Sequence, residues 1–149
     1  MRTSQKIVNE MQLTFKSRSA NEGFARTAVA AFVAGLDPTV DELADIKTAV
    51  SEAVTNCIVH GYRDTIANIY ITARIYDDNR IVVKIRDRGC GIDDIEKAME
   101  PMYTTCPGGE RAGLGFAVMQ SMCEKVRVTS KPGKGTIVTL TTRIASRDE

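Results

Sequence analysis

The sequence has little of several features that mark particular classes of protein. It contains no tryptophan, one histidine and four widely spaced cysteines, Cys57, Cys90, Cys106 and Cys123, with no Cys-x-x-Cys pair. This spacing argues against a structural zinc site or a disulfide framework and favours a reducing, cytoplasmic setting. No apolar run reaches membrane-spanning length, and the amino terminus has no apolar signal-peptide core. We therefore expect a cytoplasmic protein that does not enter a membrane.

An excess of charge of one sign is also missing. Lys and Arg number 20 against 19 Asp and Glu, for a formal net charge of +1. No basic run or aromatic–basic stripe indicates direct binding of nucleic acid. The 149 residues suffice for one domain with a real core. We expect that domain to cover residues 9–144, with residues 1–8 and 145–149 as flexible ends.

Periodicity predicts nine elements in a β-α-α-β-β-α-α-β-β order. The strands are expected at residues 11–15, 69–76, 81–87, 126–130 and 136–143, and the helices at 22–34, 43–61, 93–99 and 114–126. The first strand reads as an edge strand. Strands that alternate between apolar and charged residues favour a sheet with one wet face. The fold class is therefore α+β: a two-layer sandwich in which helices cover one face of a mostly antiparallel sheet.

The apolar residues also predict which face of each helix is buried. We expect these faces to be Phe24, Ala28, Ala31 and Phe32 in the first helix; Leu43, Ile46, Val50, Ala53, Val54 and Cys57 in the central helix; and Leu114, Val118 and Met122 in the last. Two patterns, Ser19-x-x-Glu22 and Thr39-x-x-Glu42, are typical of capping boxes at helix starts.

The central helix places two polar side chains beside its buried stripe. Glu52 and Asn56 are four residues apart and therefore about 40° apart on the same helical face. A carboxylate and a carboxamide in this position are suited to holding a water, a metal and a phosphate together. Taken alone, the same pair also reads as an ordinary solvated flank of a helix.

Three later features point to a nucleotide. Asp87 ends a predicted strand and is followed by Gly89 and Gly91, which allow close approach of a flat ligand, while its carboxylate can accept a hydrogen bond from an exocyclic amine. Gly113-x-Gly115 opens a helix whose free amides suit a polyphosphate. Arg111 lies just ahead of it, where a guanidinium can grip a terminal phosphate. The irregular stretch 100–112 is rich in Pro and Gly, and we expect it to be a mobile lid.

These motifs together resemble the ATP-binding boxes of the GHKL superfamily, the group of gyrase, Hsp90, histidine kinases and MutL with the Bergerat nucleotide fold. The matching residues are Glu52…Asn56, Asp87-Arg88-Gly89-Cys90-Gly91, Gly113-Leu114-Gly115 and Gly135-Thr136. The resemblance covers residues 11–143, and residues 24–62 resemble most closely the anti-sigma F factors of spore-forming Firmicutes. Arg88 and Cys90 fill variable positions of their box.

The resemblance implies a role for each matching residue. Glu52 would be the general base, Asn56 a magnesium ligand, and Asp87 the acceptor for the adenine amine, supported by Thr136. Arg111 would contact the γ-phosphate. The remaining nucleotide-binding residues would be Gly89, Gly91, Thr105, Gly113, Leu114 and Gly115. The expected cofactors are ATP and Mg²⁺.

The resemblance further implies an anti-sigma factor that sequesters a sporulation sigma factor and, as a serine kinase, phosphorylates an anti-anti-sigma protein. Two alternatives stay open: the detached catalytic domain of a histidine kinase, and a sigma-binding module that holds ATP without turning it over. We expect a homodimer joined through the first strand. Arg26 and Thr55 are candidate partner contacts, with Thr55 expected on the side of the central helix away from Glu52.

Two further features are interpreted as structural. Gly133-Lys134-Gly135-Thr136 resembles the end of a P-loop but joins two strands, so we expect a hairpin turn. The single histidine, His60, lies at the end of the central helix, and no dimerisation hairpin that would make it a phosphoacceptor is visible. We therefore expect His60 to be a structural residue.

Overall fold

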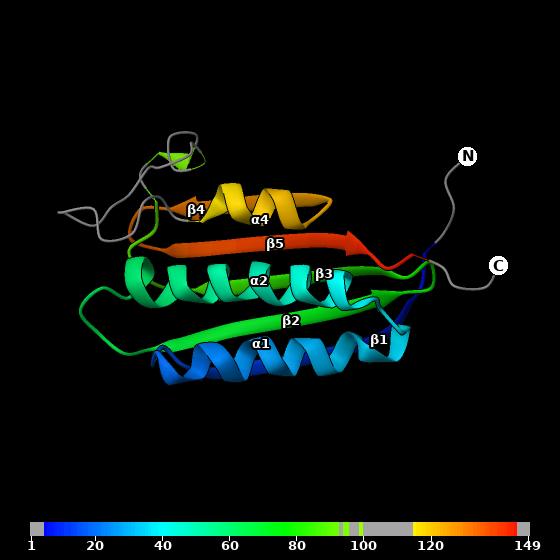
Figure 1. Cartoon of the computed structure of the whole chain (residues 1–149). Coiled ribbons are helices and arrows are strands. Elements are labelled where there is room, and N and C mark those ends of the chain that lie inside the picture. The colour runs from blue at the N-terminus through cyan, green and yellow to red at the C-terminus, as the bar shows by residue number, and fades with distance from the viewer. Residues whose placement is uncertain (1–4, 93, 96–98, 100–114, 146–149) are drawn as a thin grey trace.

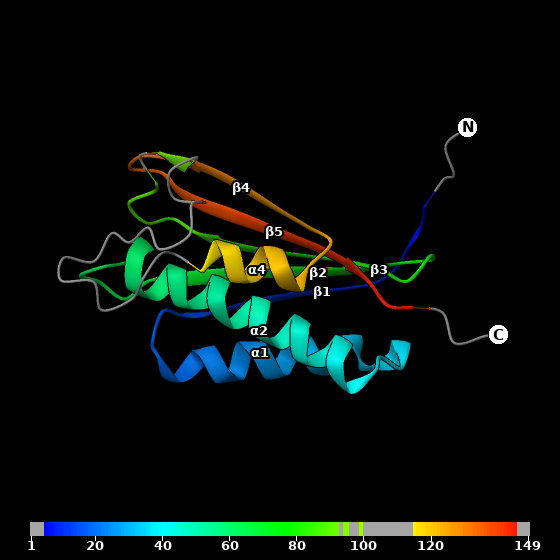
Figure 2. The same ribbon diagram turned by 45° about the horizontal axis from the view of Figure 1, so that its top comes forward.

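The structure, a computed structural model, describes residues 5–92, 94–95, 99 and 115–145. A five-stranded antiparallel sheet has the strand order β1-β2-β3-β5-β4. The helices all lie on one face of it (Figures 1 and 2), which confirms the predicted two-layer α+β fold. The strands are β1 (Ile7–Lys16), β2 (Asn68–Tyr76), β3 (Arg80–Asp87), β4 (Lys125–Lys131) and β5 (Gly135–Arg143); the helices are α1 (Ala20–Val33), η1 (Ala34–Leu36), α2 (Val40–Asn56), η2 (Cys57–Gly61) and α4 (Phe116–Met122).

Helix α2 lies between α1 and α4 over the centre of the sheet (Figure 1). It begins with the predicted capping box, since the Thr39 side chain accepts from the Glu42 amide at 3.0 Å and Glu42 accepts from the Thr39 amide at 2.8 Å. Its predicted apolar stripe is buried apart from Leu43, which is half-buried. The helix ends at Asn56 and continues as the single π-helical turn η2.

The predicted faces of the two flanking helices are only partly right: Phe32 and Met122 pack against the core, but the most deeply buried residues are others, and Leu114 lies outside the described residues. In α1 the fully buried residues are Ala25, Val29 and Val33, whereas Phe24 is 51% exposed. Apolar residues surround much of α1, so the sequence offers more than one apolar face, and packing against α2 selects the face with the smaller side chains. Helix α4 buries Phe116 and Met119 and leaves Val118 exposed. It also ends at Met122, because β4 begins at Lys125.

The predicted capping box at Ser19 is absent as well. Ser19 has helical dihedral angles and its side chain makes no capping bond, whereas an N-cap residue needs an extended conformation. The Glu22 carboxylate instead accepts a hydrogen bond from Ser51 of α2 and pairs with Arg26 at 3.4 Å. Glu22 therefore ties α1 to α2 rather than closing its own helix. Most of the predicted helix at 93–99 lies outside the described residues.

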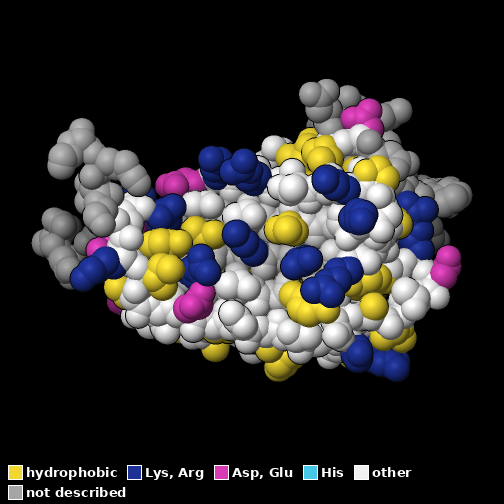
Figure 3. All heavy atoms as spheres, turned by 180° about the vertical axis from the view of Figure 1, so that it is seen from behind, with side chains coloured by type: hydrophobic (Ala, Val, Ile, Leu, Met, Phe, Trp, Pro, Cys, Tyr) yellow, Lys and Arg dark blue, Asp and Glu magenta, His cyan; other side chains and the backbone are white. Residues whose placement is uncertain are grey.

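The face of the sheet away from the helices is exposed and basic (Figure 3). Its side chains alternate with the buried ones along every strand. The cations on this face are Lys16, Arg74, Arg80, Lys84, Arg86, Lys125, Arg127, Lys131 and Arg143. Glu10 is the single carboxylate that the described strands place among them, and it pairs with Arg74 at 2.6 Å. The wet face expected from the sequence is thus confirmed.

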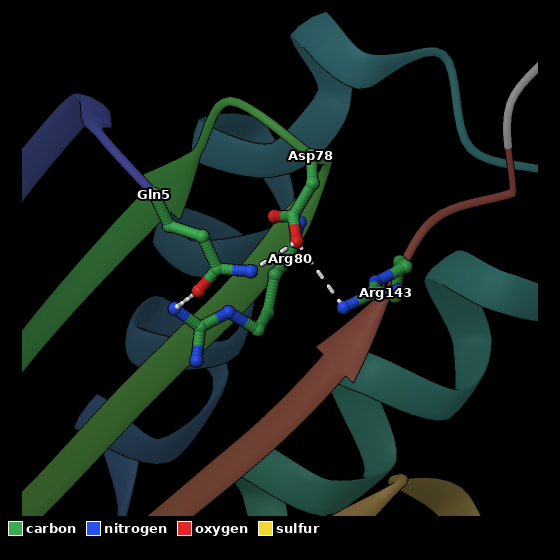
Figure 4. Close-up of polar contacts among 4 residues, drawn as sticks. All are labelled: Gln5, Asp78, Arg80 and Arg143. Atoms are coloured by element: carbon green, nitrogen blue, oxygen red, sulfur yellow. Dashed lines mark hydrogen bonds and ion pairs between the residues drawn. The ribbon is translucent and has the colours of Figure 1, made fainter. Parts of the chain in front are cut away.

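The amino-terminal segment is held against the sheet from Gln5 onward, four residues before the expected start of the domain at residue 9. Strand β1 begins at Ile7 at the sheet edge. Just before it, Gln5 donates to Asp78 at 2.6 Å and accepts from Arg80 at 2.5 Å (Figure 4). Arg143, at the end of β5, donates to the same Asp78 carboxylate at 3.2 Å. One carboxylate of the β2–β3 turn therefore links the start of β1 to the end of β5.

Among the described helices, none combines the length and apolarity that a bilayer crossing requires.

The cap of α2 gives a first test of the fold. Thr39→Ala removes the side-chain acceptor of the Glu42 amide and should lower the free energy of unfolding by about 1 kcal/mol. Urea denaturation followed by circular dichroism measures the change. Thr27→Ala, at an exposed position within α1, is the matched control and should leave stability within about 0.5 kcal/mol of the parent. Equal stability of the Thr39→Ala protein and the parent would show that the cap is dispensable.

Candidate nucleotide-binding site

The site is built where η2 meets the end of β3. In η2 the Tyr62 amide donates to the Cys57 carbonyl at 2.9 Å, and the Cys57 amide donates to the carbonyls of Ala53 and Val54. A π-helical turn of this kind inserts one residue relative to an α-helix and is frequent at functional sites. Here it brings Gly61 against Asp87: a Cβ on Gly61 would lie 2.7 Å from an Asp87 carboxylate oxygen.

Asp87 is the buried charged group of the site, with 4% of its surface exposed. It is the last residue of β3 and pairs with Thr136 of β5. Its carboxylate accepts from the Gly89 amide at 2.8 Å, and the Cys57 thiol and the Thr136 amide are nearby donors that favour its charged form. Burial raises the pKa of Asp87, and these three donors oppose that shift because they stabilise the charged form. Burial and the neighbouring Asp87 raise the pKa of Cys57 as well.

Two glycines after Asp87 are required by close backbone contacts. A Cβ on Gly89 would lie 2.1 Å from the carbonyl oxygen of Gly61, which itself accepts from the Cys90 amide at 3.0 Å. Gly91 has φ +77° and passes the Lys131 carbonyl, which a Cβ would approach to 2.2 Å. No other residue fits either position without moving backbone. The alternate glycines predicted at this turn therefore have a structural cause.

A mainly apolar pocket opens beside these residues, and a mainly apolar lining with a few polar groups is typical of small-molecule sites. It brings together four residues predicted from the sequence, Asn56, Asp87, Gly91 and Thr136. The apolar side chains of its wall are Ala53, Ile85, Ile92, Phe116 and Val138. An apolar pocket with one buried carboxylate is suited to a heteroaromatic ring that carries an amine.

Glu52 lies outside this pocket, one helical turn before Asn56. It lines a shallow hollow between α1 and α2 together with Glu22, Arg26, Ser51 and Thr55. The prediction that Thr55 lies away from Glu52 is wrong: three residues along a helix leave the two side chains only about 60° apart. Gly115, at the start of α4, comes against Glu52, since a Cβ there would lie 2.2 Å from Oε1. Gly115 has φ +74°.

Some predicted residues are not placed. Thr105, Arg111, Gly113, Leu114 and the expected lid at 100–112 lie outside the described residues. Among the described residues there is no cluster of three His, Cys, Asp or Glu side chains able to hold a metal ion. His60 is 7% exposed, and its carbonyl accepts from Cys90 Sγ at 3.0 Å and Arg63 Nε at 3.3 Å.

Sequence reasoning missed three residues that support the site. The Tyr62 hydroxyl accepts from the Arg88 amide and donates to the Asn68 carbonyl, both at 2.7 Å. The Ser130 hydroxyl accepts from the Ile92 amide at 2.8 Å and lies 2.9 Å from the Thr136 hydroxyl. Cys57 lines the pocket beside Asp87. No local sequence pattern predicts the roles of Tyr62 and Ser130, because the Arg88 and Ile92 amides that they bind are remote in sequence. Cys57 was predicted only as an apolar residue of the helix.

Comparisons with known proteins identify the family of this chain. The model of the histidine kinase-like ATPase domain matches residues 15–142. An anti-sigma F factor of Thermoanaerobacter sp. strain X514 is 58% identical over 138 residues, covering 93% of this chain and 96% of the relative. One from Geobacillus kaustophilus is 52% identical over 137 residues, covering 92% and 94%. The chain belongs to the histidine kinase-like ATPases and, among them, to the anti-sigma F factor family.

A solved structure supports the fold. The RsbU and RsbW domains of a Mycobacterium tuberculosis protein superpose with a TM-score of 0.67 at 22% identity, over 92% of this chain and 32% of that one. This likeness concerns the fold alone. It confirms the predicted architecture of a five-stranded sheet with helices on one face.

The close contact at Gly89 yields a test of the site. Gly89→Ala forces a Cβ into the Gly61 carbonyl and should cost about 1–3 kcal/mol of stability through overpacking. Thermal and urea unfolding measure it. Gly35→Ala is the matched control, because a Cβ there meets nothing within 4 Å, and it should be neutral or slightly stabilising. Equal stabilities of the two variants would contradict the contact.

Proposed function

We propose that this chain is an anti-sigma factor that sequesters a sporulation sigma factor and, as a magnesium-ATP-dependent serine kinase, phosphorylates and inactivates an anti-anti-sigma protein. Support comes from similarity to anti-sigma F factors over nearly the full length of both chains. The observation that carries the proposal is the buried Asp87 carboxylate in an apolar pocket whose wall includes Asn56 of α2, the helix that also carries Glu52.

The purine would enter the pocket beside Asp87. Its exocyclic amine would donate to the Asp87 carboxylate, and Thr136 would stand beside it, oriented by the Ser130 hydroxyl 2.9 Å away. Gly91 lines the pocket, and Gly89 packs against the Gly61 backbone beside it. The phosphates would then extend toward Asn56 and the start of α4. Thr105, Arg111, Gly113 and Leu114 complete the proposed nucleotide contacts on the strength of the sequence motifs.

The residues present fit a magnesium ion bound with the nucleotide. Mg²⁺ typically keeps several waters and takes one or two protein oxygens plus substrate phosphates. Asn56 is 9% exposed and lines the pocket, so its side chain offers such an oxygen. The ion would neutralise charge on the phosphates during transfer.

Glu52 is the proposed general base. Glu52 lies between the pocket and the hollow. It is one helical turn from Asn56, which lines the pocket, and it lines the hollow between α1 and α2. An acceptor serine entering the hollow would meet the carboxylate from the side opposite the nucleotide. Gly115 lies against Glu52, so any side chain at position 115 would displace the Glu52 carboxylate.

The hollow is also the proposed contact surface for protein partners. Arg26 and Thr55 line it with Glu52, and the Arg26 guanidinium is held by Glu22 at 3.4 Å with 40% of its side chain exposed. We further propose a homodimer through β1, an edge strand whose first residues, Ile7 and Val8, are 47% and 59% exposed. Edge strands offer unpaired backbone groups to a second chain.

One experiment distinguishes the proposal from its alternatives. The chain is incubated with labelled ATP, magnesium and a candidate anti-anti-sigma protein, and the products are tested for acid-stable phosphoserine and acid-labile phosphohistidine. Phosphoserine on the added protein supports the kinase. Phosphohistidine favours a histidine kinase domain, and nucleotide binding with no transfer favours a module that only holds ATP.

The proposed purine contact predicts that Asp87→Asn loses ATP. The amide places a donor where the carboxylate has an acceptor, and loss of a hydrogen bond to a charged group costs about 1.5–3 kcal/mol. We expect roughly 10- to 100-fold weaker binding in a calorimetric titration. The exposed Asp64→Asn serves as control and should bind like the parent. Unchanged affinity of the Asp87→Asn protein would remove Asp87 from the purine site.

The proposed base predicts that Glu52→Gln separates binding from transfer. Glutamine keeps the size of the side chain but cannot take a proton, so ATP affinity should stay near that of the parent. Phosphate transfer to the acceptor should slow by roughly 10²–10⁴-fold. Single-turnover transfer of labelled phosphate measures it, with the exposed Glu124→Gln as control. Transfer at the parental rate would show that Glu52 is not the base.

A further inference from the structure

Ser130 lies near the end of β4, directly opposite Thr136 of β5. Its hydroxyl has three partners: the Ile92 amide at 2.8 Å, the Gly135 carbonyl oxygen at 2.9 Å and the Thr136 hydroxyl at 2.9 Å. Thr136 is 9% exposed and lines the same pocket as Asp87. One small side chain therefore connects the turn after β3, the start of β5 and the pocket wall.

The three partners fix the direction of the Ser130 hydroxyl. A serine hydroxyl has one proton to donate and two lone pairs that accept. The Gly135 carbonyl can only accept, so the Ser130 proton points at it; otherwise the lone pairs of two oxygens would face each other at 2.9 Å. The Ile92 amide can only donate, so it takes one lone pair of Ser130. The second lone pair is left for Thr136.

The direction of the Thr136 hydroxyl follows from this count. Because Ser130 has no further proton to give, Thr136 is the donor in the 2.9 Å contact between the two hydroxyls. Its single proton then points at Ser130, and its Oγ1 keeps only lone pairs for a ligand. Asp87 pairs with Thr136 across β3 and β5, and an ionised carboxylate also only accepts. Two acceptors on neighbouring strands thus line the pocket.

We infer that Ser130 is a positioning residue that makes Thr136 an acceptor and thereby favours a purine with an amine over a purine with a carbonyl at the same position. The exocyclic amine of adenine has two N–H groups, one for each acceptor. The carbonyl of hypoxanthine would bring a further acceptor against both, and buried polar groups left without a partner are costly. This inference rests on the proposed function, because it takes the pocket beside Asp87 as the purine site.

The test measures the preference for ADP over inosine diphosphate, which carries a carbonyl in place of the amine. Both nucleotides are titrated calorimetrically into the full chain and its variants. Ser130→Ala frees the Thr136 proton to turn toward the pocket, so it should narrow the preference by about three- to tenfold. Ser130→Thr keeps the hydroxyl and should keep most of the preference. Thr129→Ala, at the exposed neighbouring position of β4, is the matched control and should leave both affinities at the parental values.

A double-mutant cycle separates this role from a structural one. Thr136→Val removes the acceptor itself and should narrow the preference on its own. Ser130→Ala made in addition should change the preference by less than about twofold, because Ser130 acts through Thr136. A purely structural role of Ser130 at Ile92 and Gly135 would weaken both nucleotides alike and leave their ratio unchanged.

The outcomes distinguish this inference from the proposed function. A parent chain that binds ADP and inosine diphosphate alike, a parental preference in Ser130→Ala, or the full effect of Ser130→Ala persisting beside Thr136→Val overturns the inference and leaves the proposed function standing. If circular dichroism shows that Ser130→Ala does not fold, an unchanged preference in Thr136→Val still overturns it. If the parent chain fails to bind ADP, the proposed function and the inference fall together.

Discussion

Burial of one carboxylate governs the arrangement of this molecule. Asp87 is 4% exposed, and an ionised group taken out of water must be compensated by hydrogen bonds. The turn after β3 supplies one of them from the Gly89 amide, while β5 pairs with the end of β3 at Thr136 and η2 lies against the Asp87 carboxylate at Gly61. The π-helical turn, the glycines that allow it to touch β3, and the pairing of β3 with β5 all serve this one group. A pocket with a charged floor is the result.

The same burial sets a cost. Because the pKa of Asp87 is raised in the folded chain, the folded state binds this proton more tightly than the unfolded state does. The contribution of Asp87 to stability is therefore most favourable at pH values below the pKa of the carboxyl in the unfolded chain. It declines as the pH rises through the pKa of the carboxyl in the folded chain. Above the folded pKa, the buried charge of Asp87 is therefore a source of instability. A ligand that binds only the folded chain stabilises it by mass action.

The sequence predicts those parts of the fold and the site that depend on neighbouring residues, and it misses those that depend on contacts between distant parts of the chain. The Thr39 capping box, the strand alternation and the hairpin turn at Gly133–Gly135 are local, and the structure confirms them. Asp87 and Asn56 were predicted and meet in one pocket. The buried faces of α1 and α4 were predicted only in part because apolar residues occur on several sides of each helix, and tertiary packing decides between them. Tyr62 and Ser130 act through partners far away in sequence, which a single chain does not reveal.

The basic open face of the sheet (Figure 3) has a consequence for the whole molecule. The opposite layer is acidic: α1 and α2 carry Glu22, Asp41, Glu42, Asp45 and Glu52 against Arg26 and Lys47. Among the described residues, positive charge thus gathers on the open face of the sheet and negative charge on the helical layer. Such a molecule is oriented as it approaches a charged protein, so that encounters are guided before any contact forms, and salt slows them. The hollow beside Glu52 lies on the helical layer, where Glu22 and Glu52 stand beside Arg26 and Lys47, so a partner that docks there meets charges of both signs.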